Sequence, residues 1–229
     1  MKNANDVCVI IQARLGSKRI PHKMIKPICG TTLMDICLKK LSDSECIPNK
    51  NIYISVFEQE LIEIVEKYDV NHFFRSAESA ESEGTPMSLM YEWWDKLPYK
   101  YCILVNACAP LLRIETIEDF YKNFLSIEKQ GSFAVIEKKN YFWDKSKKII
   151  TPLKEDVMNT KTADVIYEAA HCLYASRLDT IGNGIWMGNF NKPGSINLFV
   201  MEEEESFDID YDWQFQRAES IISRKKKLT

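Results

Sequence analysis

The stretch VCVIIQARLGSKRIPHK, residues 7–23, joins an apolar run to a basic loop. Residues 7–11 are all apolar, which is typical of a strand buried on both faces of a parallel sheet. The loop that follows carries five basic side chains around a Gly-Ser pair: Arg14, Lys18, Arg19, His22 and Lys23. Because the formal net charge of the whole chain is only −3, this dense local charge indicates an anion site at the end of the strand.

Further apolar runs of strand length follow at residues 51–56, 70–74 and 101–106, with helical patterns between them. Near-continuous apolar strands separated by helices are the signature of an α/β fold, a mostly parallel sheet flanked by helices on both faces. Ligands of such sheets bind outside the carboxyl ends of the strands. The basic loop is expected at one of these ends.

Capping and periodicity signals place the helices. Thr32 and Asp35 have a capping-box spacing, with Asp in place of Glu, and predict a helix start. An apolar stripe predicts a helix over 58–68. A Thr-Pro pair predicts a helix over 85–97, and Thr116 predicts the N-cap of another that runs to about residue 128.

The second half of the chain is less regular, although the length of 229 residues still favours one α/β domain over the whole chain. Residues 139–163 are lysine-rich and irregular, and we interpret them as an excursion from the sheet with an embedded short strand. Strands are expected on both sides of this excursion, at residues 131–138, 165–174 and 196–201. A final helix is expected at residues 212–223.

Composition excludes several classes of protein. No apolar run reaches the roughly 18 residues of a membrane span, and the N-terminus lacks the apolar segment of a signal peptide. The seven cysteines are scattered and form no CxxC, which indicates reduced thiols without a zinc site. We therefore expect a cytoplasmic protein without membrane contact, and an isoelectric point near 5.8 argues against a nucleic-acid partner.

The basic loop has two interpretations. Gly16 lets the backbone approach a phosphate closely, and Arg14, Lys18 and Lys23 are spaced to surround a polyphosphate. The alternative is a solvated basic loop that binds nothing. The loop is neither a Walker A motif nor a GxGxxG fingerprint, which argues against a kinase, an ATPase or a dinucleotide enzyme.

A second cluster lies in SFDIDYDWQFQRAES, residues 206–220. In an extended strand Asp208 and Asp210 point to one face while Ile209 points to the core. Such a carboxylate pair suits Mg²⁺ shared with substrate phosphates. The alternative is a strand exit followed by a helix N-cap, and Asp212 is expected to cap the last helix in either case.

The run IIQARLGSKRIPHKMIKPICGTTLMD, residues 10–35, resembles the N-terminal signature of the acylneuraminate cytidylyltransferases and their 3-deoxy-manno-octulosonate and spore-coat relatives, which reads A-R-x-G-S-K/T-x-x-P-x-K and then K-P-x-x-G-x-x-L. The D-I-D of residues 208–210, followed by a helix ending in A-E, resembles the closing motif of the same family. The two motifs stand in the expected order at opposite ends of the chain.

The resemblance implies a single domain similar to nucleotide-diphosphosugar transferases, usually a homodimer in which the excursion packs on its partner. It implies a reaction of CTP with a sugar acid, such as a nonulosonic acid, that gives a CMP-sugar and pyrophosphate with Mg²⁺. The implied catalytic residues are Arg14, Lys23 and Asp210, and the metal ligands are Asp208 and Asp210. The implied nucleotide-binding residues are Ala13, Arg14, Gly16, Ser17, Lys18, Lys23 and Asn106.

Residues on the sugar side depart from the family pattern. In LVNACAPLLR, residues 104–113, Asn106 replaces a glutamine, Cys108 and Ala109 replace a Thr-Ser pair, and Arg113 lies one residue late. His171 stands where relatives often have asparagine near the sugar pocket, and it is either a substrate contact or a hydrogen-bonded core imidazole.

These departures leave two alternatives to a sugar-acid cytidylyltransferase. One is a nucleotide-binding homologue that has lost turnover. The other is a nucleotidyltransferase with a different, non-sialic acceptor.

Overall fold

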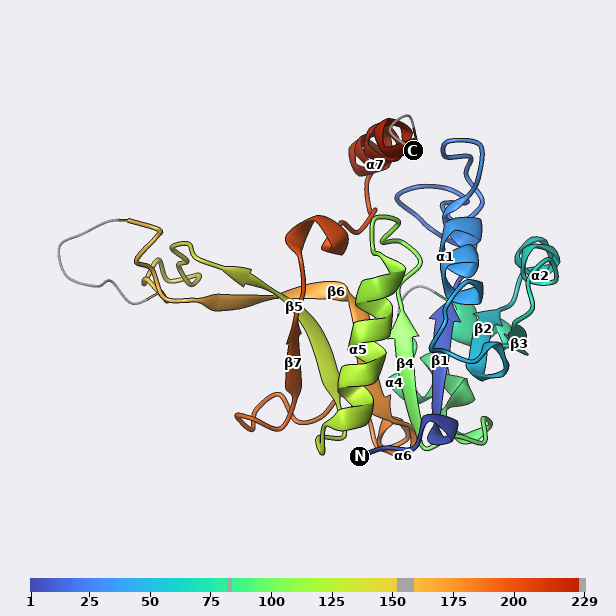
Figure 1. The fold of residues 1–229 in the computed structure, drawn as a ribbon, viewed down its shortest axis with the longest axis horizontal. Helices are drawn as coiled ribbons and strands as arrows, with labels where there is room; N and C mark the ends of the chain where they lie inside the picture. The colour runs from blue at the N-terminus through green and yellow to red at the C-terminus, as the bar shows by residue number, and fades with distance from the viewer. Residues whose placement is uncertain (82–83, 152–158, 227–229) are drawn as a thin grey trace.

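Within residues 1–81, 84–151 and 159–226, the part of the chain that the computed structural model describes, seven strands form one mixed sheet in the order β3-β2-β1-β4-β6-β5-β7 (Figure 1). The strands are β1 (Val7–Gln12), β2 (Ile52–Val56), β3 (Asn71–Phe74), β4 (Tyr101–Val105), β5 (Ser132–Lys138), β6 (Ile166–Arg177) and β7 (Asn197–Val200). Strands β1 to β4 run in parallel, β7 is parallel to β5, and β6 is antiparallel to both of its neighbours. The predicted α/β class and mostly parallel sheet are confirmed.

Helices cover both faces of this sheet. Val7, Val9 and Ile11 pack into a core shared with α1 and α5, whereas Cys8 and Ile10, which point the opposite way, pack into a core on the other face. The α-helices are α1 (Leu33–Ser42), α2 (Gln59–Val65), α3 (Ala77–Ala80), α4 (Met87–Met90), α5 (Ile114–Ser126), α6 (Leu178–Ile181) and α7 (Asp212–Lys226), and the 3₁₀ turns are η1 (Ala4–Asp6), η2 (Asn49–Asn51), η3 (Glu92–Asp95) and η4 (Glu203–Ser206).

The predicted helix over 85–97 is wrong in its length. The chain forms the short helix α4, breaks at Tyr91, and continues as the 3₁₀ turn η3. Tyr91, Glu92 and Trp93 all pack inward, where Trp93 is fully buried and Glu92 accepts the N–H of Ser76. Three consecutive inward side chains do not fit one face of an α-helix, so tertiary packing breaks the helical pattern.

Two predicted N-caps are also wrong. Helix α5 begins at Ile114 with Arg113 as its N-cap, two residues before Thr116, and the Arg113 N–H donates to Glu205 Oε2 at 3.0 Å. Helix α7 has Asp212 as its first residue and not as its N-cap. Gln214 Oε1 accepts the N–H groups of Asp210 and Tyr211 at 2.7 and 2.8 Å. By contrast, Thr32 caps α1 as expected and accepts from the Asp35 N–H at 3.0 Å.

The described parts of the excursion continue from the ends of β5 and β6 and lie away from the body of the molecule (Figure 1). These parts are residues 139–151 and 159–163, and there the expected short strand is a single antiparallel bridge between Trp143 and Ile149. Trp143 and Ile150 are exposed. Residues 139–150 therefore contribute little to the core of this chain.

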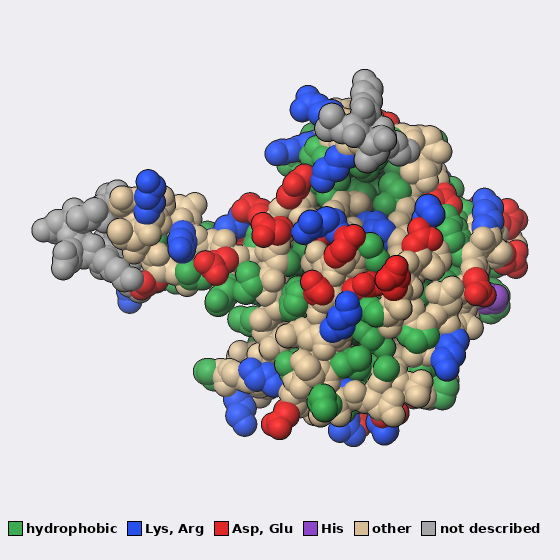
Figure 2. All heavy atoms as spheres, in the orientation of Figure 1, with side chains coloured by type: hydrophobic (Ala, Val, Ile, Leu, Met, Phe, Trp, Pro, Cys, Tyr) green, Lys and Arg blue, Asp and Glu red, His purple; other side chains and the backbone are tan. Residues whose placement is uncertain are grey.

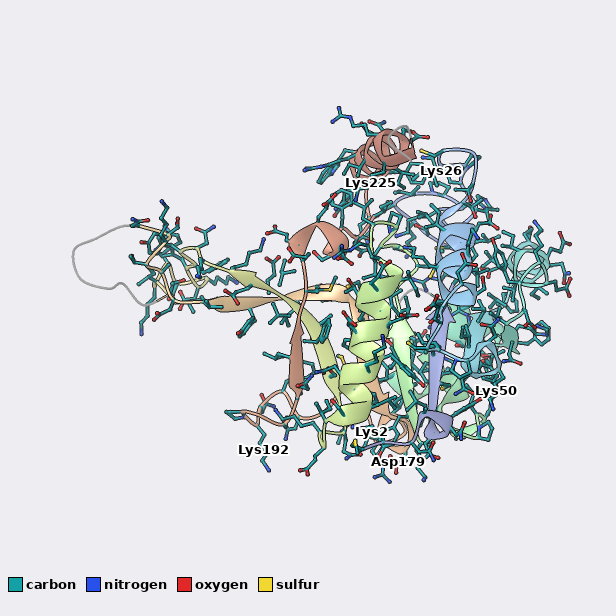
Figure 3. All side chains as sticks on the ribbon, in the orientation of Figure 1. Lys2, Lys26, Lys50, Asp179, Lys192 and Lys225 are labelled. Carbon is teal, nitrogen blue, oxygen red and sulfur yellow. The ribbon has the colours of Figure 1, made fainter. Side chains whose placement is uncertain are left out.

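The carboxyl ends of β1 and β4 point toward α7 (Figure 1). At the opposite end, Lys2 lies at the foot of α5 (Figure 3), where its ammonium donates to the carbonyl oxygens of Phe124, Ile127 and Lys129. No helix among the described residues is long and apolar enough to cross a membrane. The edge between the strand ends and α7 is where a ligand of such a sheet is expected.

Candidate active site

The basic loop leaves β1 at this edge and forms the wall of a cavity of about 450 Å³, which we call the loop cavity. Six of the seven predicted nucleotide-binding residues line it: Ala13, Arg14, Gly16, Ser17, Lys18 and Lys23. A Cβ added at Gly16 would meet no heavy atom within 4 Å, so the backbone there is open to a ligand. The loop cavity thus presents cations and exposed backbone to one space.

The carboxylate motif near the end of the chain reaches the same cavity. Asp210 Oδ1 lies 2.7 Å from Arg19 Nη2 and 3.4 Å from Lys23 Nζ. Lys23 also donates to the carbonyl oxygen of Ile209, whose side chain is fully buried in the core. The two motifs, almost 190 residues apart in the sequence, therefore converge in the fold.

Residues 207–210 form no strand, and Asp208 does not line the loop cavity but faces a neighbouring cavity of about 460 Å³ beneath α7, so the expectation that both carboxylates point into one space is wrong. Asp208 Oδ1 lies 3.4 Å from Asn106 Nδ2. Burial, followed by the negative charge of Asp210, raises the pKa of the Asp208 carboxyl above its ordinary value. A cation placed between the two carboxylates would relieve their repulsion.

Asn106 bridges the end of β4 to β6 and to Asp208 and does not line the loop cavity. Besides Asp208, its Nδ2 donates to the His171 carbonyl oxygen at 2.9 Å, and its Oδ1 accepts the Cys108 N–H at 2.9 Å. Its side chain also borders a third cavity of about 470 Å³. Asn106 therefore fixes the position of Asp208 and connects the carboxylates to this third space.

Aromatic rings line the third cavity, which we call the aromatic cavity. Phe133 stacks on Tyr174 with centroids 5.2 Å apart, and Tyr91 stacks on Trp186 at 5.1 Å. Phe190 also lines this cavity, and its ring centroid lies 6.3 Å from that of Phe133. Gln12, at the end of β1, borders both the aromatic cavity and the loop cavity, so the two spaces adjoin.

His171 lies on β6 at the edge of the aromatic cavity, with Nδ1 3.4 Å from the Tyr174 hydroxyl oxygen. It is exposed, so the alternative of a core imidazole is wrong. The pairing of β5 with β6 shifts register between Phe133 and Val135, and His171 has φ 53° there. This bulge turns the imidazole out of the core.

The family described as Cytidylyltransferase matches residues 8–223 of the chain. The chain belongs to this family. This cytidylyltransferase is 23% identical over 234 residues to the post-translational flagellin modification protein B of Campylobacter coli, an alignment that covers 96% of the chain and 97% of the relative. It is 24% identical over 233 residues to the CMP-N,N'-diacetyllegionaminic acid synthase of Campylobacter jejuni, covering 96% of each.

A solved structure of CMP:2-keto-3-deoxy-manno-octonic acid synthetase complexed with CTP matches the cytidylyltransferase with a TM-score of 0.68. The match covers 96% of this chain and 99% of that one at 11% sequence identity, which shows a shared fold. The family resemblance predicted from the two motifs is confirmed, and the protein is an enzyme of the cytidylyltransferase family.

Two residues that sequence reasoning missed hold the loop of the cytidylyltransferase in place. Arg75, directly after β3, is buried and donates from Nη2 to the Ala13 carbonyl oxygen at 2.6 Å, and burial lowers the pKa of this guanidinium to about 10. Glu58, after β2, accepts the Leu15 N–H at 2.7 Å. Both follow parallel strands at their carboxyl ends, which is the signal that would have identified them.

Arg14 and Arg113 make contacts that the sequence did not indicate. The Arg14 guanidinium lines the loop cavity and donates to the carbonyl oxygens of Ala80 and Glu81. Arg113 lies outside the loop and aromatic cavities and donates from Nε to Glu205 Oε1 at 2.7 Å. The arginine that lies one residue late in the sequence is therefore a partner of Glu205.

The donor set fits a metal ion that arrives with a phosphate ligand. Among the described residues, no group of three or more His, Cys, Asp or Glu side chains can hold a metal on its own. Asp210 lines the loop cavity and Asp208 lines the neighbouring cavity, and Mg²⁺ commonly binds one or two carboxylates together with substrate phosphates. The residues present suit Mg²⁺ in that form.

Proposed function

We propose that this cytidylyltransferase transfers a cytidylyl group from CTP to an acylated sugar acid, a nonulosonic acid or a close relative, and releases pyrophosphate. The observation that carries the proposal is the meeting of the basic loop with Asp210 in one cavity that adjoins an aromatic cavity. The basic loop cavity suits a triphosphate, and the aromatic cavity suits an acceptor with apolar substituents.

The loop side of this arrangement binds the nucleotide. Lys23 and Lys18 neutralise phosphate charge, and Arg14 offers a bidentate fork to a phosphate. Backbone N–H groups around Gly16 and Ser17 approach the phosphates. Positioning and charge neutralisation are the main contributions of a protein to phosphoryl transfer, and these residues supply both.

In the reaction, a hydroxyl oxygen of the acceptor bonds to the α-phosphorus while the bond from that phosphorus to the bridging oxygen breaks. Pyrophosphate leaves, and the hydroxyl proton passes to a water molecule. Lys23 and Arg14 stabilise the charge that accumulates on the pyrophosphate. Mg²⁺ held by Asp208 and Asp210 would draw charge off the α-phosphate.

The aromatic cavity is the basis for the acceptor class. The rings that line this cavity, among them the exposed Phe190, offer apolar surface for the methyl groups and C–H bonds of an acylated sugar. The Campylobacter jejuni relative is named for a diacetylated acid of this kind. We further infer a homodimer, in which the excursion packs on a second copy.

Pyrophosphate release tests the reaction. Wild-type protein with CTP and Mg²⁺ is expected to release pyrophosphate with N-acylated nonulosonic acids and far less with an octulosonate that lacks acyl groups. CTP is expected to raise the melting temperature more than UTP, GTP or ATP. CTP binding without turnover on any acceptor would favour a homologue that has lost catalysis.

Asp208→Asn is expected to lower turnover by at least about a hundredfold, because a charged metal ligand is lost, with an unchanged circular dichroism spectrum. Asp212→Asn is the matched control, since this exposed carboxylate two residues beyond the motif pairs with Lys26 instead. Figure 3 shows Lys26 beside α7. Equal activity of the Asp208 and Asp212 variants would contradict the metal assignment.

Phe190→Ala tests where the acceptor binds. Phe190 is 62% exposed, so its truncation is expected to leave the fold intact. Loss of one aromatic contact is expected to raise KM for the acceptor about tenfold, with KM for CTP unchanged. Phe74→Ala, at the opposite edge of the sheet, is the control, and an unchanged acceptor KM for Phe190→Ala would place the acceptor elsewhere.

A further inference from the structure

Two cationic side chains contact the same carboxylate, that of Asp210, in the loop cavity. Asp210 Oδ1 lies within ion-pair distance of both Arg19 and Lys23, at 2.7 and 3.4 Å. Both positive side chains thus neutralise Asp210, whereas Asp208 contacts the Asn106 amide. A lone divalent cation approaching this site meets little net negative charge.

The two cations are held differently. The Lys23 side chain is 11% exposed and also donates to the Ile209 carbonyl oxygen, so it is fixed in the wall of the cavity. The Arg19 side chain is 53% exposed, and its guanidinium lies 5.3 Å from the centroid of the Tyr211 ring. Arg19 is the cation that can leave Asp210 at low cost.

A triphosphate changes this balance. Its phosphate oxygens attract a guanidinium more strongly than one carboxylate does, because they offer several charges and a bidentate geometry. Arg19 lines the same cavity as the rest of the loop, so it can turn to a phosphate and remain in that cavity. Asp210 is then released to the metal.

We propose that Arg19 occupies Asp210 in place of a divalent cation until a nucleoside triphosphate arrives, so that metal and triphosphate bind cooperatively. The inference rests on the proposed metal and CTP sites. It assigns a positioning role to a residue of the loop that the motif leaves unspecified. By linkage, the metal must raise the affinity for the triphosphate by the same factor.

Mn²⁺, which takes the same oxygen ligands as Mg²⁺ and is visible by electron paramagnetic resonance, is the probe. Without nucleotide, the full-length Arg19→Gln protein is expected to bind Mn²⁺ about two- to fivefold more tightly than wild type, the range expected for loss of a partly exposed ion pair. When Asp210→Asn is already present, adding Arg19→Gln should no longer change the affinity for Mn²⁺.

Calorimetry with CTP and no acceptor provides the second measurement. The factor by which Mn²⁺ improves CTP affinity is expected to be smaller in Arg19→Gln than in wild type, by the same two- to fivefold. Arg14→Gln is the matched control, because it removes the same charge from the same loop but its guanidinium contacts Ala80 and Glu81. It is expected to leave Mn²⁺ affinity without nucleotide unchanged.

Equal Mn²⁺ affinity in wild type and Arg19→Gln would overturn the inference. So would an equal gain in Arg14→Gln, which would mean that any lost charge has this effect. Failure of CTP to bind would overturn both the inference and the proposed function. Metal–CTP coupling of the expected kind without turnover on any acceptor would support the inference and contradict the proposed reaction alone.

Discussion

Glu205 is a buried carboxylate that joins the segment after β7 to the start of α5. It accepts from the Arg113 N–H and guanidinium and from the Thr116 hydroxyl. Burial acts first and raises the pKa of Glu205, but these hydrogen bonds together outweigh it and lower the pKa below its ordinary value. The ionised form of Glu205 therefore stabilises the fold.

The sign of the pH dependence follows from this lowered pKa. The stabilisation is fully present above the unfolded pKa of about 4.3 and is lost as the pH falls through the lower folded pKa. Glu205→Gln is expected to reduce the free energy of unfolding by about 1–2 kcal/mol at pH 7, since a charge-assisted hydrogen-bond network is weakened. The difference from wild type should shrink below about pH 4.

Urea unfolding at several pH values measures this difference. Glu204→Gln is the matched control, because its exposed neighbouring carboxylate pairs with Lys225 at the surface, and its effect should stay within about 0.5 kcal/mol. A Glu205→Gln deficit that is the same at pH 7 and pH 3 would show that ionisation of Glu205 is not the cause.

At the scale of the helices, a helix start was predictable where its capping partner is close in the sequence, and it was not predictable where the partner is far away. The start of α1 was predictable because its cap, Thr32, and its partner, Asp35, are three residues apart. The start of α5 was not, because the carboxylate that accepts its first N–H comes from Glu205, 92 residues later. The break at Tyr91 was not predictable either, because Tyr91 packs on Trp186, which comes from another part of the chain.

The loop cavity and the aromatic cavity also differ in how far the sequence predicts them. The loop cavity was predictable because the basic residues of its wall lie within one stretch, 13–23, that leaves a strand. The aromatic cavity was not predictable, because its rings come from β5, β6 and two loops and share no sequence spacing. His171 reached this cavity through a bulge that depends on the pairing of β5 with β6.

At the scale of the whole molecule, one group of exposed apolar side chains lies on the excursion, the start of β6 and the edge strand β7. The excursion and the start of β6 expose Trp143, Ile150 and Tyr167 at 55, 57 and 48%. The neighbouring edge strand β7 exposes Leu198 and Val200. Figure 2 shows the projection of this region away from the body, with hydrophobic side chains where it joins. Exposed apolar side chains that lie together on neighbouring segments are typical of an interface.

A second copy of the chain is the partner that we expect on this surface, and Trp143→Asp tests it. A charge in place of an aromatic anchor is expected to weaken dimerisation by at least about thirtyfold. In light scattering after size exclusion, wild type should show twice the chain mass of 26.6 kDa, whereas the variant should approach that mass on dilution. Phe74→Asp places the same charge on an exposed aromatic position of the opposite sheet edge, 59% exposed, and should leave the mass unchanged. A wild-type monomer at all concentrations, or a Trp143 variant that dimerises normally, would remove the excursion from the interface.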